Sequence, residues 1–163
     1  MRFRGRAVLF LSITLPSTAL AAEDELVLGL EPGYALLTTS EGSKHGGTVN
    51  LSAWLGITET LALAVTAGGS SGFSERDTIY EALGGVILAL DVFRVIPYGE
   101  ALVGAFLTKD ALAPSYRLGV GADYLISPSL AIGLVARYRG LPDALGGDGV
   151  FTAQIRLALR IEL

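Results

Sequence analysis

The residues best suited to catalysis lie close together in one short stretch: Ser40, Glu41, Ser43 and His45. A serine, a histidine and a carboxylate can form a hydrolytic triad. His45 is the only histidine and cysteine is absent, so thiol catalysis and multi-histidine metal sites are excluded. A triad also needs a rigid frame that holds nucleophile and base in contact. This stretch is glycine-rich, so we expect an exposed loop histidine, no catalytic residues and no enzyme.

The remaining acidic residues suggest no cofactor or metal site. Asp77, Asp110, Asp143 and Asp148 do not follow the spacing of a calcium-binding loop, and we interpret them as solvated charges. No glycine pattern has the strand-to-helix context that a nucleotide-binding loop requires.

A different set of charges alternates with apolar residues. In Val150–Leu163, VFTAQIRLALRIEL, every second residue from Phe151 is apolar, and Arg156, Arg160 and Glu162 fall on the other face. A period of two predicts a β-strand with one apolar and one polar face. This strand exceeds the usual globular length of about 5–6 residues and suffices for a bilayer, which takes about 9–11.

Seven further segments resemble the last one, so eight strands are expected. Their predicted ranges are 25–39, 47–57, 61–70, 78–90, 95–108, 115–126, 129–139 and 150–163. Tight turns at 58–60, 91–94 and 127–128 alternate with longer stretches at 40–46, 71–77, 109–114 and 140–149. Short turns on one side and longer loops on the other are typical of membrane barrels, with both termini on the short-turn side. We expect a bend or bulge at Pro32, and a second at Gly84–Gly85.

The start of the chain has the three parts of a secretory signal. Arg2, Arg4 and Arg6 precede a short apolar core, and Ala19-Leu20-Ala21 is a cleavage site, so we predict a signal peptide over 1–21 and a barrel domain over 22–163. Removal of the signal peptide would take away three of the twelve basic residues. Nine basic residues then stand against sixteen acidic ones, a net charge of −7, so nucleic acid is a poor partner. No later run of 18 apolar residues predicts a spanning helix, which favours the closed barrel.

The orientation of the two faces separates a soluble, lipocalin-like cup from a membrane barrel. Aromatic residues with the parity of the apolar face gather near the strand ends, as in an interfacial girdle. Five lie at the long-loop end and Tyr124 at the other; the five are Tyr34, Tyr80, Tyr116, Tyr138 and Phe151. We therefore predict an all-β fold, an eight-stranded antiparallel up-and-down transmembrane β-barrel.

The polar face then points inward and carries charges of both signs. These are Glu31, Glu81, Glu100, Asp123, Arg117, Arg137, Arg156, Arg160 and Glu162. An eight-stranded barrel is just wide enough for its side chains to fill it, and an unpaired buried ion costs several kcal/mol. We expect a salt-bridged interior in which Arg156 contacts Glu31 or Glu100.

Two segments carry a family resemblance. Val95–Leu107, VIPYGEALVGAFL, and Tyr116–Gly140, with Gly119, Gly121, Asp123, Tyr124, Pro128, Leu130, Arg137 and Tyr138, resemble the OmpA/OmpX-like outer-membrane β-barrel superfamily. The resemblance implies the outer membrane of a Gram-negative bacterium and periplasmic termini. It also implies lipid, lipopolysaccharide and the barrel-insertion machinery as partners of a monomer. The family usually ends on an aromatic residue, whereas this chain ends on Leu163.

The expected function is a structural or surface-interaction role for a largely filled, porin-like barrel. A narrow conduit for ions or small solutes is the alternative, because Gly68, Gly85, Gly104, Gly119, Gly121 and Gly133 could leave space inside. A lipid A-modifying enzyme and a soluble binding cup remain less favoured.

Overall fold

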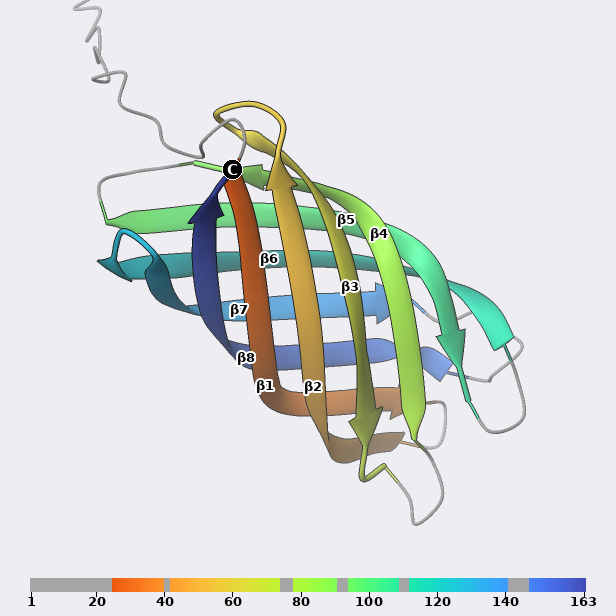
Figure 1. Cartoon of the computed structure of the whole chain (residues 1–163). Coiled ribbons are helices and arrows are strands. Elements are labelled where there is room, and N and C mark those ends of the chain that lie inside the picture. The colour runs from red at the N-terminus through yellow and green to blue at the C-terminus, as the bar shows by residue number, and fades with distance from the viewer. Residues whose placement is uncertain (1–24, 40–41, 74–77, 91–93, 109–111, 141–146) are drawn as a thin grey trace, which may run out of the picture.

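Eight antiparallel strands close into one barrel (Figure 1). The computed structural model describes residues 25–39, 42–73, 78–90, 94–108, 112–140 and 147–163. The expected signal peptide, residues 1–21, lies outside this part of the chain. The strands are β1 (Glu25–Thr39), β2 (Gly42–Gly56), β3 (Leu61–Ser71), β4 (Ile79–Ala89), β5 (Val95–Leu107), β6 (Leu112–Ser127), β7 (Leu130–Gly140) and β8 (Gly147–Glu162).

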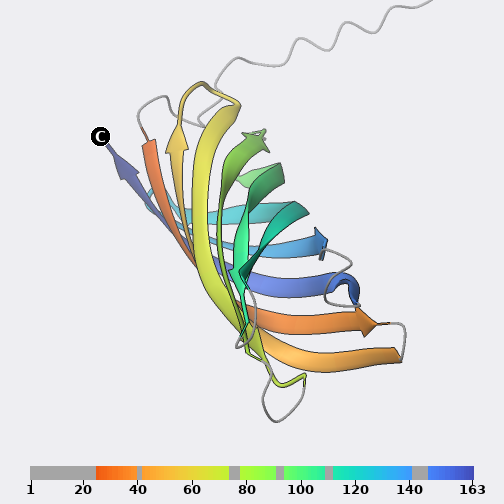
Figure 2. The same cartoon turned by 90° about the vertical axis from the view of Figure 1, so that its right-hand side faces the viewer.

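Each strand pairs with its neighbour in the sequence, and β1 closes the barrel by pairing with β8. The closing register runs from Glu25↔Glu162 to Thr39↔Gly147. Figures 1 and 2 show that the start of β1 and the end of β8 lie at the same end of the barrel. The predicted fold class, an eight-stranded up-and-down barrel, is confirmed.

The strands extend further than the apolar alternation indicated, so part of the loop prediction is wrong. Residues 42–46 were expected in a loop, but β2 continues through them and pairs Gly42 with Thr39 and Gly46 with Ala35. Residues 112–114 and 147–149 likewise belong to strands. Backbone hydrogen bonds continue a ladder whether or not the side chains are apolar. The contrast between long and short connections is therefore weaker than predicted.

Pro32 interrupts one ladder without shifting its register. It pairs with Val49 on β2, but pairing with β8 lapses between Leu30↔Leu157 and Gly33↔Gln154. Proline lacks the N–H that this ladder needs. The Nε2 atom of Gln154 donates to the backbone oxygen of Glu31 at 2.9 Å, and β1 curves strongly along its length (Figure 1). The strand bends, as expected, but no bulge forms.

No bulge forms at Gly84–Gly85, the second predicted position, because β4 keeps its register with both neighbours there. Register shifts occur instead between Thr38 and Thr39 on β1, and between Leu125 and Ser127 on β6.

The outer face of the barrel is apolar and exposed. Large hydrophobic side chains point outward from every strand, among them Leu51, Val65, Val103 and Leu134 at 61–68% exposure. The described residues contain no helix long and apolar enough to cross a membrane. An apolar exterior is the arrangement of a transmembrane barrel and the reverse of a soluble cup.

The six predicted girdle residues all lie on this outer face. Tyr34, Tyr80, Tyr116, Tyr138, Phe151 and Tyr124 are between 42% and 58% exposed. Several of these rings cover an outward-facing glycine on the adjacent strand: Tyr116 lies over Gly140 and Tyr138 over Gly149. Such aromatic cover shields a glycine that has no side chain to protect the ladder.

Candidate functional site: the charged barrel interior

The pleat of each strand turns the polar face into the barrel. Seven of the nine predicted interior charges are buried, at 0–7% exposure: Glu31, Glu81, Glu100, Asp123, Arg117, Arg137 and Arg156. Arg160 is only partly buried, and Glu162 is exposed at the end of β8. Glu162 was expected inside but is exposed, because the last residue of a strand lies at the barrel mouth, where water reaches it.

The end of the network nearest the termini is built around Arg156. Its Nη1 pairs with Asp123 Oδ2, and its Nε lies 3.2 Å from Glu31 Oε1. The Oγ atom of Ser52 donates to the same Glu31 oxygen at 2.8 Å. The expected contact between Arg156 and Glu31 is thus present. Glu100, the other acidic partner considered, binds different arginines.

The network continues from Glu31 toward the loops. Arg137 Nη1 lies 2.7 Å from Glu31 Oε2, and its Nε lies 2.6 Å from Glu100 Oε1. Arg117 Nε is 3.0 Å from that same Glu100 oxygen, and its Nη1 is 3.0 Å from Glu81 Oε1. Acids and bases therefore alternate along a single connected path through the lumen.

Arg139 ends this path and was not among the predicted interior residues. Its Nη1 lies 3.0 Å from Glu81 Oε2, and its side chain is 3% exposed. With Arg139, the path from Asp123 holds four acids and four arginines, whose formal charges cancel. A neutral, alternating network lets each ion keep an opposite charge beside it, which buried ions require.

Glu25, the partner of the predicted Arg160, was also missed. Glu25 is buried beside Arg160, with Oε1 2.5 Å from Nε, at the mouth of the barrel. The alternation that identified Glu31 and Arg137 extends to Glu25 and Arg139, which have the same parity on the same strands. The signal was therefore present in the sequence, at the strand ends.

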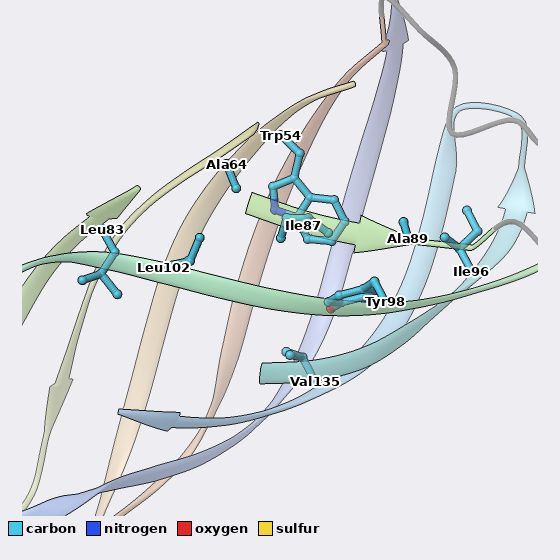
Figure 3. Packing of buried hydrophobic residues seen from close by; sticks show 9 residues of the cluster. All are labelled: Trp54, Ala64, Leu83, Ile87, Ala89, Ile96, Tyr98, Leu102 and Val135. Carbon is cyan, nitrogen blue, oxygen red and sulfur yellow. The ribbon is translucent and has the colours of Figure 1, made fainter. Parts of the chain in front are cut away.

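The interior at the termini end is apolar, which the sequence reasoning did not anticipate. Figure 3 shows this cluster, in which the ring of Trp54 packs edge-on against Tyr98 at 4.8 Å between centroids. Ile87 and Ile96 belong to the same cluster. The guanidinium carbon of Arg156 lies 3.4 Å from the Trp54 ring centroid, a cation–π contact. The Arg156 end of the network therefore packs against the aromatic rings of Trp54 and Tyr98.

A second apolar layer lies at the loop end. It consists of Ala35, Phe73, Ile79, Phe106 and Val150, and Val150 and Ala35 are fully buried. Register pairs Phe106 with Glu81 and Val150 with Arg139, so this second cluster packs beside the loop end of the ion network. The predicted polar interior was incomplete, because inward-facing apolar residues do not disturb the outward alternation from which it was inferred.

The interior glycines do not leave open space. A Cβ at Gly119 would lie 2.8 Å from Glu100 Cγ and 2.9 Å from Arg137 Cγ. At Gly133 it would meet Asp123, and at Gly121 the ring of Tyr98. Large inward side chains occupy the volume that these glycines leave, so the space expected for a conduit is filled at these positions.

His45 lies on β2 rather than in a loop, and it is exposed. The hydroxyl of Tyr34 hydrogen-bonds to its Nδ1. Ser40 and Glu41, the other members of the possible triad, lie outside the described residues. Within the described ranges, no group of three or more metal-ligating side chains could hold an ion.

A small cavity of about 50 Å³ opens at the termini end. Every strand contributes to its lining, and Glu25, Trp54, Asp123 and Arg160 supply its polar and aromatic members. Nearby, Asp123 Oδ1, Arg156 Nη2 and the hydroxyl of Tyr98 are buried without a hydrogen-bond partner among the described residues. These groups need water, since a buried polar atom without a partner is costly.

Solved structures share this fold across most of the chain. Neisserial surface protein A aligns with a TM-score of 0.69 at 17% identity, covering 85% of this chain and 97% of that one. Ail, the attachment invasion locus protein of Yersinia pestis, aligns with 0.60 at 18% identity, covering 86% and 100%. A designed transmembrane β-barrel aligns with 0.54 at 21% identity, covering 86% and 98%. No protein-family model and no curated protein sequence matches.

These similarities establish the fold of the small outer-membrane barrels, and the resemblance expected from the sequence is confirmed at that level. The fold alone does not assign a role, since a barrel designed without natural ancestry also adopts it.

Proposed function

We propose that the chain is a non-enzymatic, monomeric outer-membrane barrel with a structural or surface-interaction role, and that its lumen is closed to solutes. The observation that carries this proposal is the filled interior. An alternating network of eight buried charges packs against an aromatic cluster near one end of the barrel and an apolar cluster near the other. Such an interior holds the wall rigid and offers no continuous aqueous path.

The proposed setting follows from the outer surface. The exposed apolar wall requires lipid, and the tyrosine girdle fits the level of the headgroups. Outer-membrane lipid and lipopolysaccharide are therefore the proposed partners, with the barrel-insertion machinery during assembly. The termini are proposed to be periplasmic, so that the opposite end presents the connections between β1 and β2, β3 and β4, β5 and β6, and β7 and β8.

Planar-bilayer recording tests the closed lumen. Wild-type protein, shown to be inserted by heat-modifiable migration on gels, is expected to give no steady conductance. Arg156→Ala is expected to stay closed as well, because both apolar layers remain. The double variant Trp54→Ala/Tyr98→Ala, which removes both aromatic rings from the cluster at the termini end, serves as a comparison. Steady ohmic current through the wild type would contradict the proposal.

The narrow conduit is the second candidate, and one observation favours it. The cavity at the termini end reaches Asp123, close to buried polar atoms that lack partners. Water at these atoms would extend from the mouth toward the network. If ions pass, exchange of partners around Arg156 would have to open the path, so Arg156→Ala should then alter conductance relative to the wild type.

A further inference from the structure

The cavity at the termini end has walls of small side chains. Its volume of about 50 Å³ has room for about four water-sized groups, since each takes about 10–15 Å³. Four strands contribute an alanine to it: Ala62 on β3, Ala89 on β4, Ala131 on β7 and Ala158 on β8. Trp54 also lines it, and its ring packs edge-on against Tyr98 (Figure 3). The space is therefore largely apolar and accepts only a few atoms.

The polar part of the cavity wall comes from an ion pair with unused hydrogen-bonding capacity. Asp123 lines the cavity at 4% exposure, and its Oδ2 pairs with Nη1 of Arg156. The remaining carboxylate oxygen, Oδ1, and the second terminal nitrogen of Arg156, Nη2, are buried without a hydrogen-bond partner among the described residues. A carboxylate oxygen accepts hydrogen bonds and a guanidinium nitrogen donates them. The pair therefore leaves one acceptor and one donor unused.

The charges around this cavity already cancel. Asp123 belongs to the network of four acids and four arginines. At the mouth, Arg160 donates to both carboxylate oxygens of Glu25, at 2.5 and 2.7 Å. A further ion would enter this balanced surrounding without a counter-charge, which is strongly unfavourable for a buried ion. The ligand that fits the cavity is therefore neutral.

We propose that this cavity binds a small neutral molecule of the primary-amide class. A primary amide carries an acceptor and a donor side by side, so its oxygen accepts from Arg156 Nη2 while its nitrogen donates to Asp123 Oδ1. A short alkyl group packs against the alanines and Trp54. The ligand enters from the side of the termini. The proposal rests on the closed lumen proposed above, because a cavity that continued into a conduit would admit ions as well.

Three molecules of the same planar shape test the class of ligand: acetamide is neutral, acetate is an anion and acetamidinium is a cation. Each is titrated into the barrel in detergent micelles, where both ends meet water, and the emission of Trp54, the only tryptophan, reports occupation. Acetamide is expected to give a saturable shift. Both ions are expected to bind at least about tenfold more weakly, because neither finds a counter-charge. An ion that binds as tightly as acetamide would overturn the neutral-ligand assignment.

A variant that fills the cavity tests its location. Ala62→Leu occupies the space from β3 and is expected to abolish the acetamide shift. Ala101→Leu is the matched control: Ala101 is exposed on β5 and does not line the cavity, so this variant should respond as wild type. If heat-modifiable migration shows that Ala62→Leu does not fold, Ala131→Leu fills the same space from β7, across the barrel. An undiminished shift in a folded filling variant, or no shift in the wild type, would overturn the site.

Arg160→Gln tests whether the balance of charge sets the preference. It leaves the Glu25 carboxylate without this partner, so acetamidinium should bind at least about tenfold more tightly than to the wild type, while acetate stays weak. Unchanged exclusion of acetamidinium would overturn the charge argument. Steady conductance of the wild type in planar bilayers contradicts the closed lumen instead, whichever result the amide titration gives.

Discussion

Arg156 shows how strongly single residues depend on their partners in this barrel. It is fully buried, pairs with Glu31 and Asp123, and stacks on the only tryptophan, Trp54. Burial of a charge at 0% exposure is tolerated because opposite charge and an aromatic face replace the water it has lost. Arg160 makes a similar pair with Glu25, but at the mouth, where water contributes to solvation.

Arg156→Met should therefore destabilise the barrel much more than Arg160→Met. Removing one partner of a buried pair costs about 3–5 kcal/mol, because the remaining charge has no compensation. Arg160→Met should cost less, because the Glu25 carboxylate that remains lies at the mouth of the barrel, where water can partly solvate it. Urea unfolding of the vesicle-inserted barrel, followed by the fluorescence of Trp54, measures both losses. Similar losses for the two variants would contradict the role assigned to burial.

At the level of the strands, glycines act differently on the two faces. Inward-facing Gly133 provides room for Asp123, and a Cβ there would lie 2.6 Å from the backbone oxygen of Ala122. Outward-facing Gly99 is open, with Gly119 O at 3.9 Å as its only close neighbour. Backbone atoms cannot move aside as a flexible side chain can, so crowding is costly at the first position only.

Gly133→Ala is expected to lower the free energy of unfolding by about 1–3 kcal/mol, the usual cost of overpacking. Gly99→Ala, its matched control, should be neutral or stabilise by about 0.4–1 kcal/mol, because alanine restricts the unfolded chain. Urea midpoints in lipid vesicles distinguish the two. A stable Gly133→Ala barrel would show that the interior at Asp123 is looser than described.

At the scale of the whole molecule, the barrel is inverted relative to a soluble protein. The eight charges of the network and the only tryptophan lie inside, while aliphatic side chains such as Val103, at 67% exposure, form the outside. Because hydrocarbon cannot satisfy polar groups, this distribution is stable only in lipid. The inversion also distinguishes the membrane barrel from a lipocalin-like cup.

Vesicles of brominated phosphatidylcholine test the inversion directly. Trp54 should be quenched little, because the wall of the barrel separates it from the lipid. A tryptophan introduced by Val103→Trp in a Trp54→Phe background should be quenched several-fold more strongly, because it touches the acyl chains. Equal quenching at the two positions, or a protein that stays in the aqueous fraction, would argue for the soluble cup.

The sequence alone was enough to predict the strands and the faces of their residues. The alternation in β8 predicted the barrel, and the same parity identifies Glu31, Arg137 and the girdle tyrosines, because the pleat is a local property of consecutive residues. It extends to Glu25 and Arg139 at the strand ends, where the reasoning was not applied. How far the strands continue, as β2 does through His45, depends on backbone pairing and leaves no apolar pattern.

Only the tertiary structure decided what each inward side chain meets. Arg137 pairs with Glu31 although 106 positions separate them, and Trp54 meets Arg156 from a strand that is not adjacent to β8. These contacts cross the lumen, so they depend on the tilt and stagger with which the sheet closes. A period of two has no information about that closure. It determines which way a residue points, and the closed barrel determines which residue stands opposite.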